Sequence, residues 1–237
     1  MGQSFFIWKG IDCRSMGVWQ DGAAAIVRPE ERVNHVQIPG QSGDLTETEG
    51  EDVYNSYVQT VTILVKGGFN VRRVYGWLRG SGYVTFSGEP DKRQKARIIG
   101  AITLNKHSYN LDWWIGEVQF YCQAFKERLS ETPVTITSSP ADIVNGGDVK
   151  SKPRIKAKAS ATSLSVQCGN DTLTVTGLTS GNEYYIDSEI MEVTDAAGTT
   201  LLTKNSSGKF PRLPVGKSPV QGSGWSKLVI EKRERFL

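Results

Sequence analysis

The chain has 237 residues, of which 38% are hydrophobic and 22% are charged. This composition supplies enough apolar side chains for buried cores, so it excludes a globally disordered chain. The formal net charge is only +3, which gives no electrostatic argument for a nucleic-acid or membrane-surface partner. No apolar stretch approaches the roughly 20 residues of a membrane span, and we expect no signal peptide because no basic segment precedes the first apolar residues.

Three segments of the first half are rich in β-branched and aromatic residues and predict strands, at 57–65, 97–104 and 113–121. In the last of them the apolar residues Ile115, Val118 and Phe120 do not share one face, which predicts a β-bulge near Gly116.

One helix is predicted after Asn70, a favourable N-cap residue. Apolar residues then follow at the spacing of one helix face: Val71, Val74, Tyr75 and Leu78. Gly80 is the expected stop. A further helical turn is expected at 92–96.

Residues 131–153 are rich in proline, serine and glycine and lack helical periodicity, which predicts an extended connection between two domains, with room for one short strand inside it. We therefore expect domains at 1–133 and 151–237, joined by 134–150. In the second half, short alternating segments with turn residues between them predict strands at 154–159, 164–168, 173–176, 183–187, 192–195, 199–204 and 225–233, with a loop at 205–224. Such a run of strands without helices favours an antiparallel β-sandwich.

The residues that usually carry catalysis are scarce. His35 and His107 are the only histidines, and neither lies in a metal-binding spacing. No nucleophile elbow, phosphate-binding loop or dinucleotide fingerprint is found. Cys13, Cys122 and Cys168 are odd in number and far apart, so we interpret them as apolar core residues of a chain folded in a reducing compartment. We expect no enzymatic activity, no catalytic or cofactor-binding residues and no cofactor or metal.

Acidic residues leave two alternatives open. Glycosidases use two carboxylates, and the pairs Asp187 with Glu189 and Glu89 with Asp91 fit that requirement, although solvated acids are far commoner. A cluster of acidic residues in one loop could bind calcium: Glu47, Glu49, Glu51 and Asp52. It lacks the Asp/Asn-Gly alternation of a calcium loop, so a solvated or interface loop is favoured.

Basic residues gather at one place, and no aromatic residues alternate with them: Lys92, Arg93, Lys95 and Arg97. A nucleic-acid contact is therefore less favoured than an exposed face or a contact with another subunit.

Several motifs occur in an order that is fairly specific. In the first half these are Phe6-Ile7-Trp8-Lys9-Gly10, Ile38-Pro39-Gly40-Gln41-Ser42-Gly43, Trp77-Leu78-Arg79-Gly80, Glu89-Pro90-Asp91 and Val118-Gln119-Phe120-Tyr121-Cys122. In the second half they are Tyr185-Ile186-Asp187-Ser188-Glu189, residues 208–216, and the basic end from Arg233 to Leu237. In this order the chain resembles the distal tail proteins of long-tailed phages. Ala124-Phe125 departs from the family, which often has a proline there.

The resemblance implies a mostly β fold, with an N-terminal β-sandwich or split-barrel-like domain that carries one helix and a C-terminal galectin-like antiparallel β-sandwich. It also implies a non-enzymatic virion protein at the tail tip, assembled in the host cytoplasm. Six copies would form a ring through the N-terminal domain, in contact with the tail tube protein, a tail-tip, lysin or fibre protein, and receptor-binding proteins. DNA would pass through the ring without sequence-specific recognition, and no membrane contact is implied.

The alternative is a carbohydrate-binding module or adhesin, which needs aromatic side chains on an exposed face of the sandwich. Tyr184, Tyr185 and Trp225 are the candidates. Because neighbouring residues of a strand point to opposite faces, at least one of the two adjacent tyrosines belongs to the core.

Overall fold

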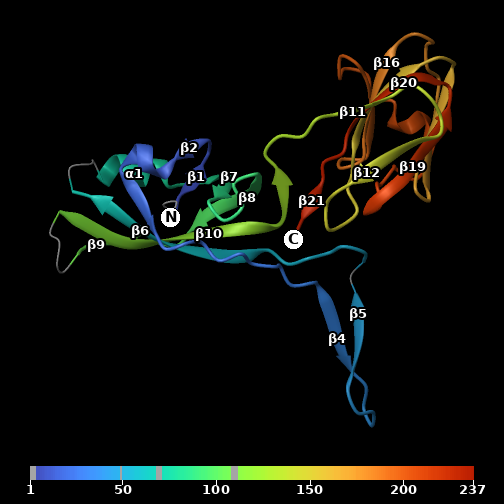
Figure 1. Ribbon diagram of the computed structural model, residues 1–237. Coiled ribbons are helices and arrows are strands. Elements are labelled where there is room, and N and C mark those ends of the chain that lie inside the picture. The colour runs from blue at the N-terminus through green and yellow to red at the C-terminus, as the bar shows by residue number, and fades with distance from the viewer. Residues whose placement is uncertain (1–3, 49, 68–70, 108–111) are drawn as a thin grey trace. The chain divides into compact units, whose positions relative to one another are not determined.

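The computed structural model describes residues 4–48, 50–67, 71–107 and 112–237 and is built almost entirely of strands, which confirms the predicted mostly β class (Figure 1). The chain divides into two compact units. Unit 1 is Met1–Leu129 with Leu237, and unit 2 is Ser130–Phe236.

Unit 1 contains one large antiparallel sheet in the order β2-β1-β7-β8-β10-β6-β3, with β9 also paired to β10. Its strands are β1 (Phe6–Trp8), β2 (Ile11–Asp12), β3 (Val18–Asp21), β4 (Val33–Gln37), β5 (Asp44–Thr48), β6 (Tyr57–Lys66), β7 (Ser81–Phe86), β8 (Lys92–Ile99), β9 (Leu104–Lys106) and β10 (Trp113–Arg128). The short 3-10 helix η1 (Cys13–Met16) and the helix α1 (Val71–Trp77) complete it. Strands β4 and β5 form a separate two-stranded sheet.

The core of unit 1 is aromatic. Phe120 of β10 is fully buried and packs edge-on against Phe6, Trp8 and Phe86, with ring centroids 5.5 to 5.7 Å apart. These contacts bring β1 and β7 over the centre of β10, and buried side chains of β3 and β6 join the same core. A single curled sheet can therefore enclose a core together with one helix.

Helix α1 closes this core through Trp77. The Trp77 ring stacks on Phe6 at 5.8 Å, and its indole donates a hydrogen bond to the Trp8 carbonyl at 3.3 Å. The Trp8 indole donates in return to the Trp77 carbonyl at 3.2 Å. The predicted helix is confirmed, although Tyr75 points outward and Trp77 takes its place in the buried face. Asn70, the predicted N-cap, lies outside the described residues.

Three local predictions for unit 1 need correction. The strand expected at 97–104 is interrupted after Ile99, where Gly100 adopts a φ of +71°. Residues 92–96 are not helical but begin β8, because Gln94 and Ala96 alternate into the core with period two. The pairing of β10 with β6 runs without interruption through Gly116, and the irregularity lies between Cys122 and Lys126, opposite β8.

Gly116 has a different role from the predicted bulge. A β-carbon at this position would lie 2.3 Å from the carbonyl oxygen of Thr103, so glycine permits a close approach of two backbones. Gly116→Ala is expected to lower the free energy of unfolding by roughly 1–3 kcal/mol, because the backbone must shift.

The control for this substitution is Gly76→Ala in α1, where no atom lies within 4 Å of the added carbon. This second change is expected to raise the free energy of unfolding by up to about 1 kcal/mol through helix propensity. Urea denaturation of both variants measures the difference, and equal effects would contradict the role assigned to Gly116.

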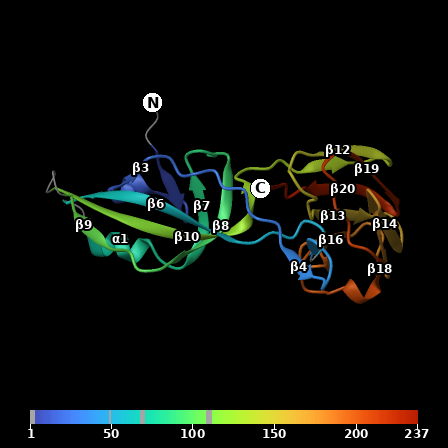
Figure 2. The same cartoon turned by 90° about the horizontal axis from the view of Figure 1, so that it is seen from below.

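Unit 2 consists of two five-stranded antiparallel sheets, β11-β20-β13-β16-β17 and β12-β19-β14-β15-β18 (Figure 2). The ten strands of these sheets are β11 (Val134–Ile136), β12 (Ala141–Asn145), β13 (Arg154–Ala159), β14 (Ser163–Cys168), β15 (Asp171–Thr176), β16 (Glu183–Asp187), β17 (Glu192–Asp195), β18 (Ser206–Gly208), β19 (Gly216–Ser223) and β20 (Trp225–Glu231). A further short strand, β21 (Arg235–Phe236), belongs to neither sheet. The 3-10 helix η2 (Thr203–Asn205) follows β17.

Both sheets of unit 2 contribute to one core, which confirms the predicted antiparallel sandwich. Ile155 and Ile186 come from the first sheet, and Val166 and Val220 come from the second. Each of these side chains has an exposed fraction of 0%.

Three segments of unit 2 differ from expectation. Residues expected to form the connection instead hold β11 and β12, one in each sheet. The predicted loop at 205–224 contains β18 and the eight-residue strand β19. The strand expected at 199–204 is reduced to a single bridge between Thr194 and Leu201, followed by η2.

No helix within the described ranges is long and apolar enough to cross a membrane.

Candidate interaction surfaces

Strands β4 and β5 form an arm that lacks a third strand within the described residues. At its base, the Arg32 amide donates to the Val53 carbonyl at 2.9 Å and the Asn55 amide donates to the Glu30 carbonyl at 2.8 Å. Val36 and Leu45 face each other across the two strands, with exposed fractions of 37% and 48%.

The motif Ile38-Pro39-Gly40-Gln41-Ser42-Gly43 forms the turn of the arm, and β5 follows it. Ile38 has an exposed fraction of 41%. A two-stranded ribbon is at best marginally stable in water unless something packs against it. The arm therefore has the properties of a segment that gains its stability from a partner surface.

The Glu89-Pro90-Asp91 motif ties the turn between β7 and β8 to the end of β10. The Glu89 carboxylate contacts the ammonium groups of Lys92 and Lys126, each at 2.6 Å. Burial alone raises the pKa of Glu89, but the two lysines outweigh it and the net pKa lies below the usual range. The Asp91 carbonyl accepts from the Leu129 amide at 2.8 Å. These contacts favour a structural role for the motif over catalysis.

Three of the four basic residues of β8 pair with acidic groups of unit 1: Lys92, Arg93 and Lys95. Arg93 lies 3.4 Å from the Glu127 carboxylate and stacks over the Tyr83 ring at 4.3 Å. Lys95 lies 4.0 Å from the same carboxylate. Glu127 and Tyr83 could not be identified as partners from the sequence, because they belong to other strands. Most of the cluster is therefore paired within unit 1, and it is not a free basic patch.

In unit 2, the second carboxylate pair is bound by two arginines. Arg233 makes a bidentate contact with Asp187 at 2.8 and 2.9 Å, and Arg235 pairs with Glu189. Burial raises the pKa of Asp187, but the Arg233 guanidinium and the Glu189 amide outweigh it, so the net pKa is lowered. Asp187 and Glu189 are two residues apart, as are Arg233 and Arg235, so the two pairs form a ladder. This equal spacing is a signal in the sequence from which the pairing could have been found.

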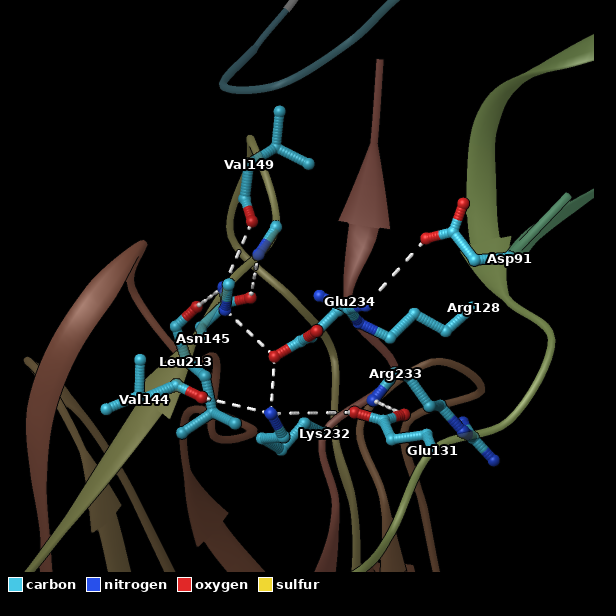
Figure 3. A network of polar contacts seen from close by, with 12 residues as sticks. Asp91, Arg128, Glu131, Val144, Asn145, Val149, Leu213, Lys232, Arg233 and Glu234 are labelled. Atoms are coloured by element: carbon cyan, nitrogen blue, oxygen red, sulfur yellow. Dashed lines mark hydrogen bonds and ion pairs between the residues drawn. The ribbon is translucent and has the colours of Figure 1, made fainter. Parts of the chain in front are cut away.

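A buried polar network lies beside this ladder (Figure 3). The Lys232 ammonium contacts the Glu234 carboxylate and donates to the Val144 carbonyl at 3.1 Å. Glu234 has an exposed fraction of 3% and also accepts from the Gly146 amide at 2.8 Å. Asn145 donates to the carbonyls of Val149 and Leu213 at 3.1 and 3.0 Å. The network fixes the end of β12 to the segment after β20.

Within this network of described residues, the Glu131 carboxylate has one oxygen without a hydrogen-bond donor. One carboxylate oxygen accepts from the Arg233 amide at 2.9 Å, while the other lies 4.0 Å from Lys232 and has no hydrogen-bond donor among the described residues. Burial raises the pKa of Glu131, and the nearby Glu234 carboxylate raises it further. The folded chain therefore holds the Glu131 proton more tightly than the unfolded chain does.

This raised pKa predicts a pH-dependent contribution to stability. The contribution is complete below the unfolded-state pKa of about 4.5 and is lost as the pH rises through the higher folded-state pKa, because the unfolded chain releases its proton first. In Glu131→Gln this loss is absent, so the melting temperature of the native protein relative to the variant is expected to fall as the pH rises above about 4.5. Parallel curves would contradict the assignment, and Glu127→Gln, whose side chain is 35% exposed, is the control.

The remaining candidate residues are placed as follows. His35 lies in β4, with its ring 3.4 Å from the Thr46 hydroxyl. Cys13, Cys122 and Cys168 are buried free thiols, as predicted, and burial raises the pKa of Cys122 and Cys168 to about 12. Among the residues that the structure describes, no three or more His, Cys, Asp or Glu side chains gather as a metal site. Glu49 lies outside those residues, and His107 follows β9.

The aromatic candidates for sugar binding are mostly in the core. Tyr184 and Trp225 have exposed fractions of 6% and 9%. The Tyr184 hydroxyl accepts from the Thr179 amide at 2.9 Å, and the Trp225 indole donates to the Ser165 carbonyl at 3.1 Å. Tyr185 is on the outer face, as alternation requires, but the guanidinium of Arg154 lies over its ring at 4.4 Å. The aromatic platform required by the alternative function is therefore lacking at these positions.

Neither a family description nor a curated protein sequence matches the chain. Among solved structures, the Dit protein of phage SPP1 (gp 19.1) matches with a TM-score of 0.78 and 17% sequence identity, over 100% of both chains. The chain has the fold of this Dit protein. SPP1 Dit is described as a paradigm of the hub adsorption apparatus in phages that infect Gram-positive bacteria. The resemblance found in the sequence motifs is thus confirmed at the level of the fold.

A second structure, the phage p2 baseplate in its activated conformation with Sr, matches this chain with a TM-score of 0.51 and 7% sequence identity. The match covers 97% of this chain and 98% of the p2 chain. Both likenesses extend over the two units, so the order of the units is shared as well as their separate folds.

Proposed function

We propose that the chain is a structural protein of a phage tail tip that forms a closed ring of six copies. The ring joins the tail tube protein to a tail-tip, lysin or fibre protein and to receptor-binding proteins, in a virion assembled in the host cytoplasm. The observation that carries the proposal is the likeness to SPP1 Dit over the whole length of both chains.

Unit 1 supplies the subunit contacts in this proposal. A ring of identical copies needs two different surfaces on each copy, one of which reaches the next copy. The arm provides the first, since it presents the exposed pair Val36 and Leu45. Strand β3 is an edge of the large sheet, and an edge strand is suited to receive a neighbouring strand. Unit 2 is the peripheral, galectin-like domain.

We further propose that the protein is not an enzyme. The carboxylates that fit a glycosidase pair are occupied, Glu89 by two lysines and Asp187 by Arg233. The carbohydrate-binding module remains the less favoured function, because Tyr184 and Trp225 are buried.

Mass measurement by light scattering together with negative-stain images tests the proposal. Six-membered rings are expected for the full chain, alone or after mixing with its tail-tip partner. A protein that stays monomeric under both conditions would overturn the ring, and hydrolysis of peptidoglycan or polysaccharide that is lost in Asp187→Asn would overturn the non-enzymatic assignment.

A further inference from the structure

The arm has an apolar face with an acidic residue beside it. Val36 of β4 lies opposite Leu45 of β5, and the next pair towards the base of the arm is Asn34 with Glu47. Because residues two apart in a strand point to the same side, these two pairs share one face, and Asp44 points to the other. One face of the arm therefore presents two exposed apolar side chains next to a carboxylate.

The arm and its base are also strongly acidic. Residues 33–52 contain no lysine or arginine, and their five carboxylates are Asp44, Glu47, Glu49, Glu51 and Asp52. Within the part of the chain that the structure describes, Glu47 makes no ion pair. A surface that receives the apolar face of the arm must therefore offer apolar area and a positive charge side by side.

Three side chains on the outer face of the large sheet have this combination, and we call them the Tyr121 row. Tyr121 of β10 lies directly opposite Val58 of β6 on one side and Arg97 of β8 on the other. Val58 and Tyr121 have exposed fractions of 47% and 41%, and neither belongs to the buried cluster of unit 1. Arg97 is exposed and, unlike the other three basic residues of β8, makes no ion pair among the described residues. The row is thus apolar at one end and cationic at the other.

The arm and the Tyr121 row also agree in spacing. Neighbouring strands are about 4.8 Å apart, so Arg97 lies about 7 Å from the midpoint between Val58 and Tyr121. Residues two apart in a strand are also about 7 Å apart, which is the separation of Leu45 and Glu47 along the arm. When two sheets pack with their strands at a near right angle, the apolar pair of the arm covers Val58 and Tyr121 while Glu47 reaches Arg97.

We propose that the arm of one copy lies across the Tyr121 row of the next copy, with Glu47 paired to Arg97. The inference rests on the proposed ring and names the surface that receives the arm within it. The complementary charges and the matched spacing favour a second copy as the partner, and the exposure of both surfaces shows that the arm does not cover the row of its own chain. Pairing with the edge strand β3 would occupy the backbone of the arm and leave its apolar face in water.

A mixture of two full-length variants, each with one added cysteine, tests the contact, since a link between them must join two copies. Leu45→Cys marks the arm. Gln119→Cys marks the receiving face, because Gln119 lies two residues from Tyr121 on the exposed side of β10. The three native cysteines are buried and so do not compete for the reagent. A short bismaleimide is expected to link the mixture into dimers and to leave either variant alone unlinked.

Asp21→Cys, at the exposed end of β3, is the control for the receiving side because it marks the edge of the sheet. Links from Leu45→Cys to Asp21→Cys but not to Gln119→Cys would overturn the inference and leave the ring intact, as would rings that form without either link. A chain that light scattering shows to be monomeric, alone and with its tail-tip partner, and that gives no link overturns both the inference and the ring.

Charge reversal, followed by light scattering over a range of concentrations, provides an independent test. Glu47→Lys and Arg97→Glu are each expected to weaken the contact between copies by at least about tenfold, and the two changes in one chain are expected to restore it. Asp44→Lys is the matched control, because it makes the same charge change on the opposite face of the arm and should leave the contact unchanged. All three side chains are exposed, so the melting temperatures should stay close to that of the native protein. Equal weakening by Asp44→Lys, or no recovery in the combined variant, would overturn the inference.

Discussion

Replacing Val36, Ile38 and Leu45 of the arm by serine is expected to leave the protein monomeric under conditions in which the native chain forms rings. The three side chains have exposed fractions of 37%, 41% and 48% in the single chain. If a neighbouring copy buries them, each contributes on the order of 1 kcal/mol or more to the contact. Their combined loss then weakens each contact by more than about a hundredfold.

The effect on the fold should be small, because these three side chains do not pack against the buried core of unit 1. None of them belongs to the buried cluster of unit 1. The melting temperature is therefore expected to change little, while light scattering reports monomer. A variant that unfolds would contradict the description of the arm as separate from the core.

A matched control is available in unit 2. Ile190, Met191 and Leu201 are even more exposed, at 60%, 59% and 57%. Replacing these three by serine removes comparable apolar surface but should leave ring formation unchanged. If the unit 2 variant is monomeric and the arm variant still forms rings, the subunit contacts lie in unit 2 and the assignment of the arm is wrong.

The strands that the sequence predicted best are those in which side-chain alternation and turn residues agree. Strand β6 shows buried Val61, Ile63 and Val65 between more exposed neighbours, and its predicted bounds differ from the observed ones by one residue at the C-terminal end. Strand β16 shows the same agreement, with Tyr184 and Ile186 buried. Local pattern and tertiary packing favour the same structure in these segments.

Strand β19 was missed because its composition resembles a loop. Pro219 lies inside it, yet β14 pairs only with Val220 and the residues after it, so at Pro219 the strand has a neighbour on one side alone. Proline is tolerated at such a position. Gly222 is required because a β-carbon there would lie 2.0 Å from the Ser165 carbonyl oxygen. Residues that usually break a strand are here explained by the partner strands, which local sequence does not show.

The interaction surfaces were predictable only in part. The arm segment and the Glu89-Pro90-Asp91 motif can be identified from the sequence. The ion pair between Glu89 and Lys126 cannot, because Lys126 lies 37 positions later in the chain, in another strand. Glu234 lies in the segment whose composition indicates a basic C-terminal end, yet its side chain is almost fully buried. Ion pairs across strands depend on register, and register is decided by the fold as a whole.

Unit 2 is expected to fold when the chain begins at residue 130 and to fail when it begins at residue 150. The shorter chain lacks β11 and β12, which pair with β20 and β19. It also lacks Ile136 and Ile143, which are exposed by only 4% and 2%. Each isoleucine alone contributes roughly 2–5 kcal/mol. Their combined loss approaches the roughly 5–15 kcal/mol that stabilises a typical domain.

Circular dichroism during heating measures the difference between these two chains. A cooperative transition is expected for 130–237 and none for 150–237. Single substitutions in the full chain give the matched comparison, because Ile143 and Val144 are neighbours in β12 with exposed fractions of 2% and 56%. Ile143→Ala should lower the free energy of unfolding by roughly 2–5 kcal/mol, and Val144→Ala by less than about 1 kcal/mol. If 150–237 melts as cooperatively as 130–237, residues 134–150 are a connection, as the proline- and serine-rich composition suggested, and β11 and β12 are dispensable to the sandwich.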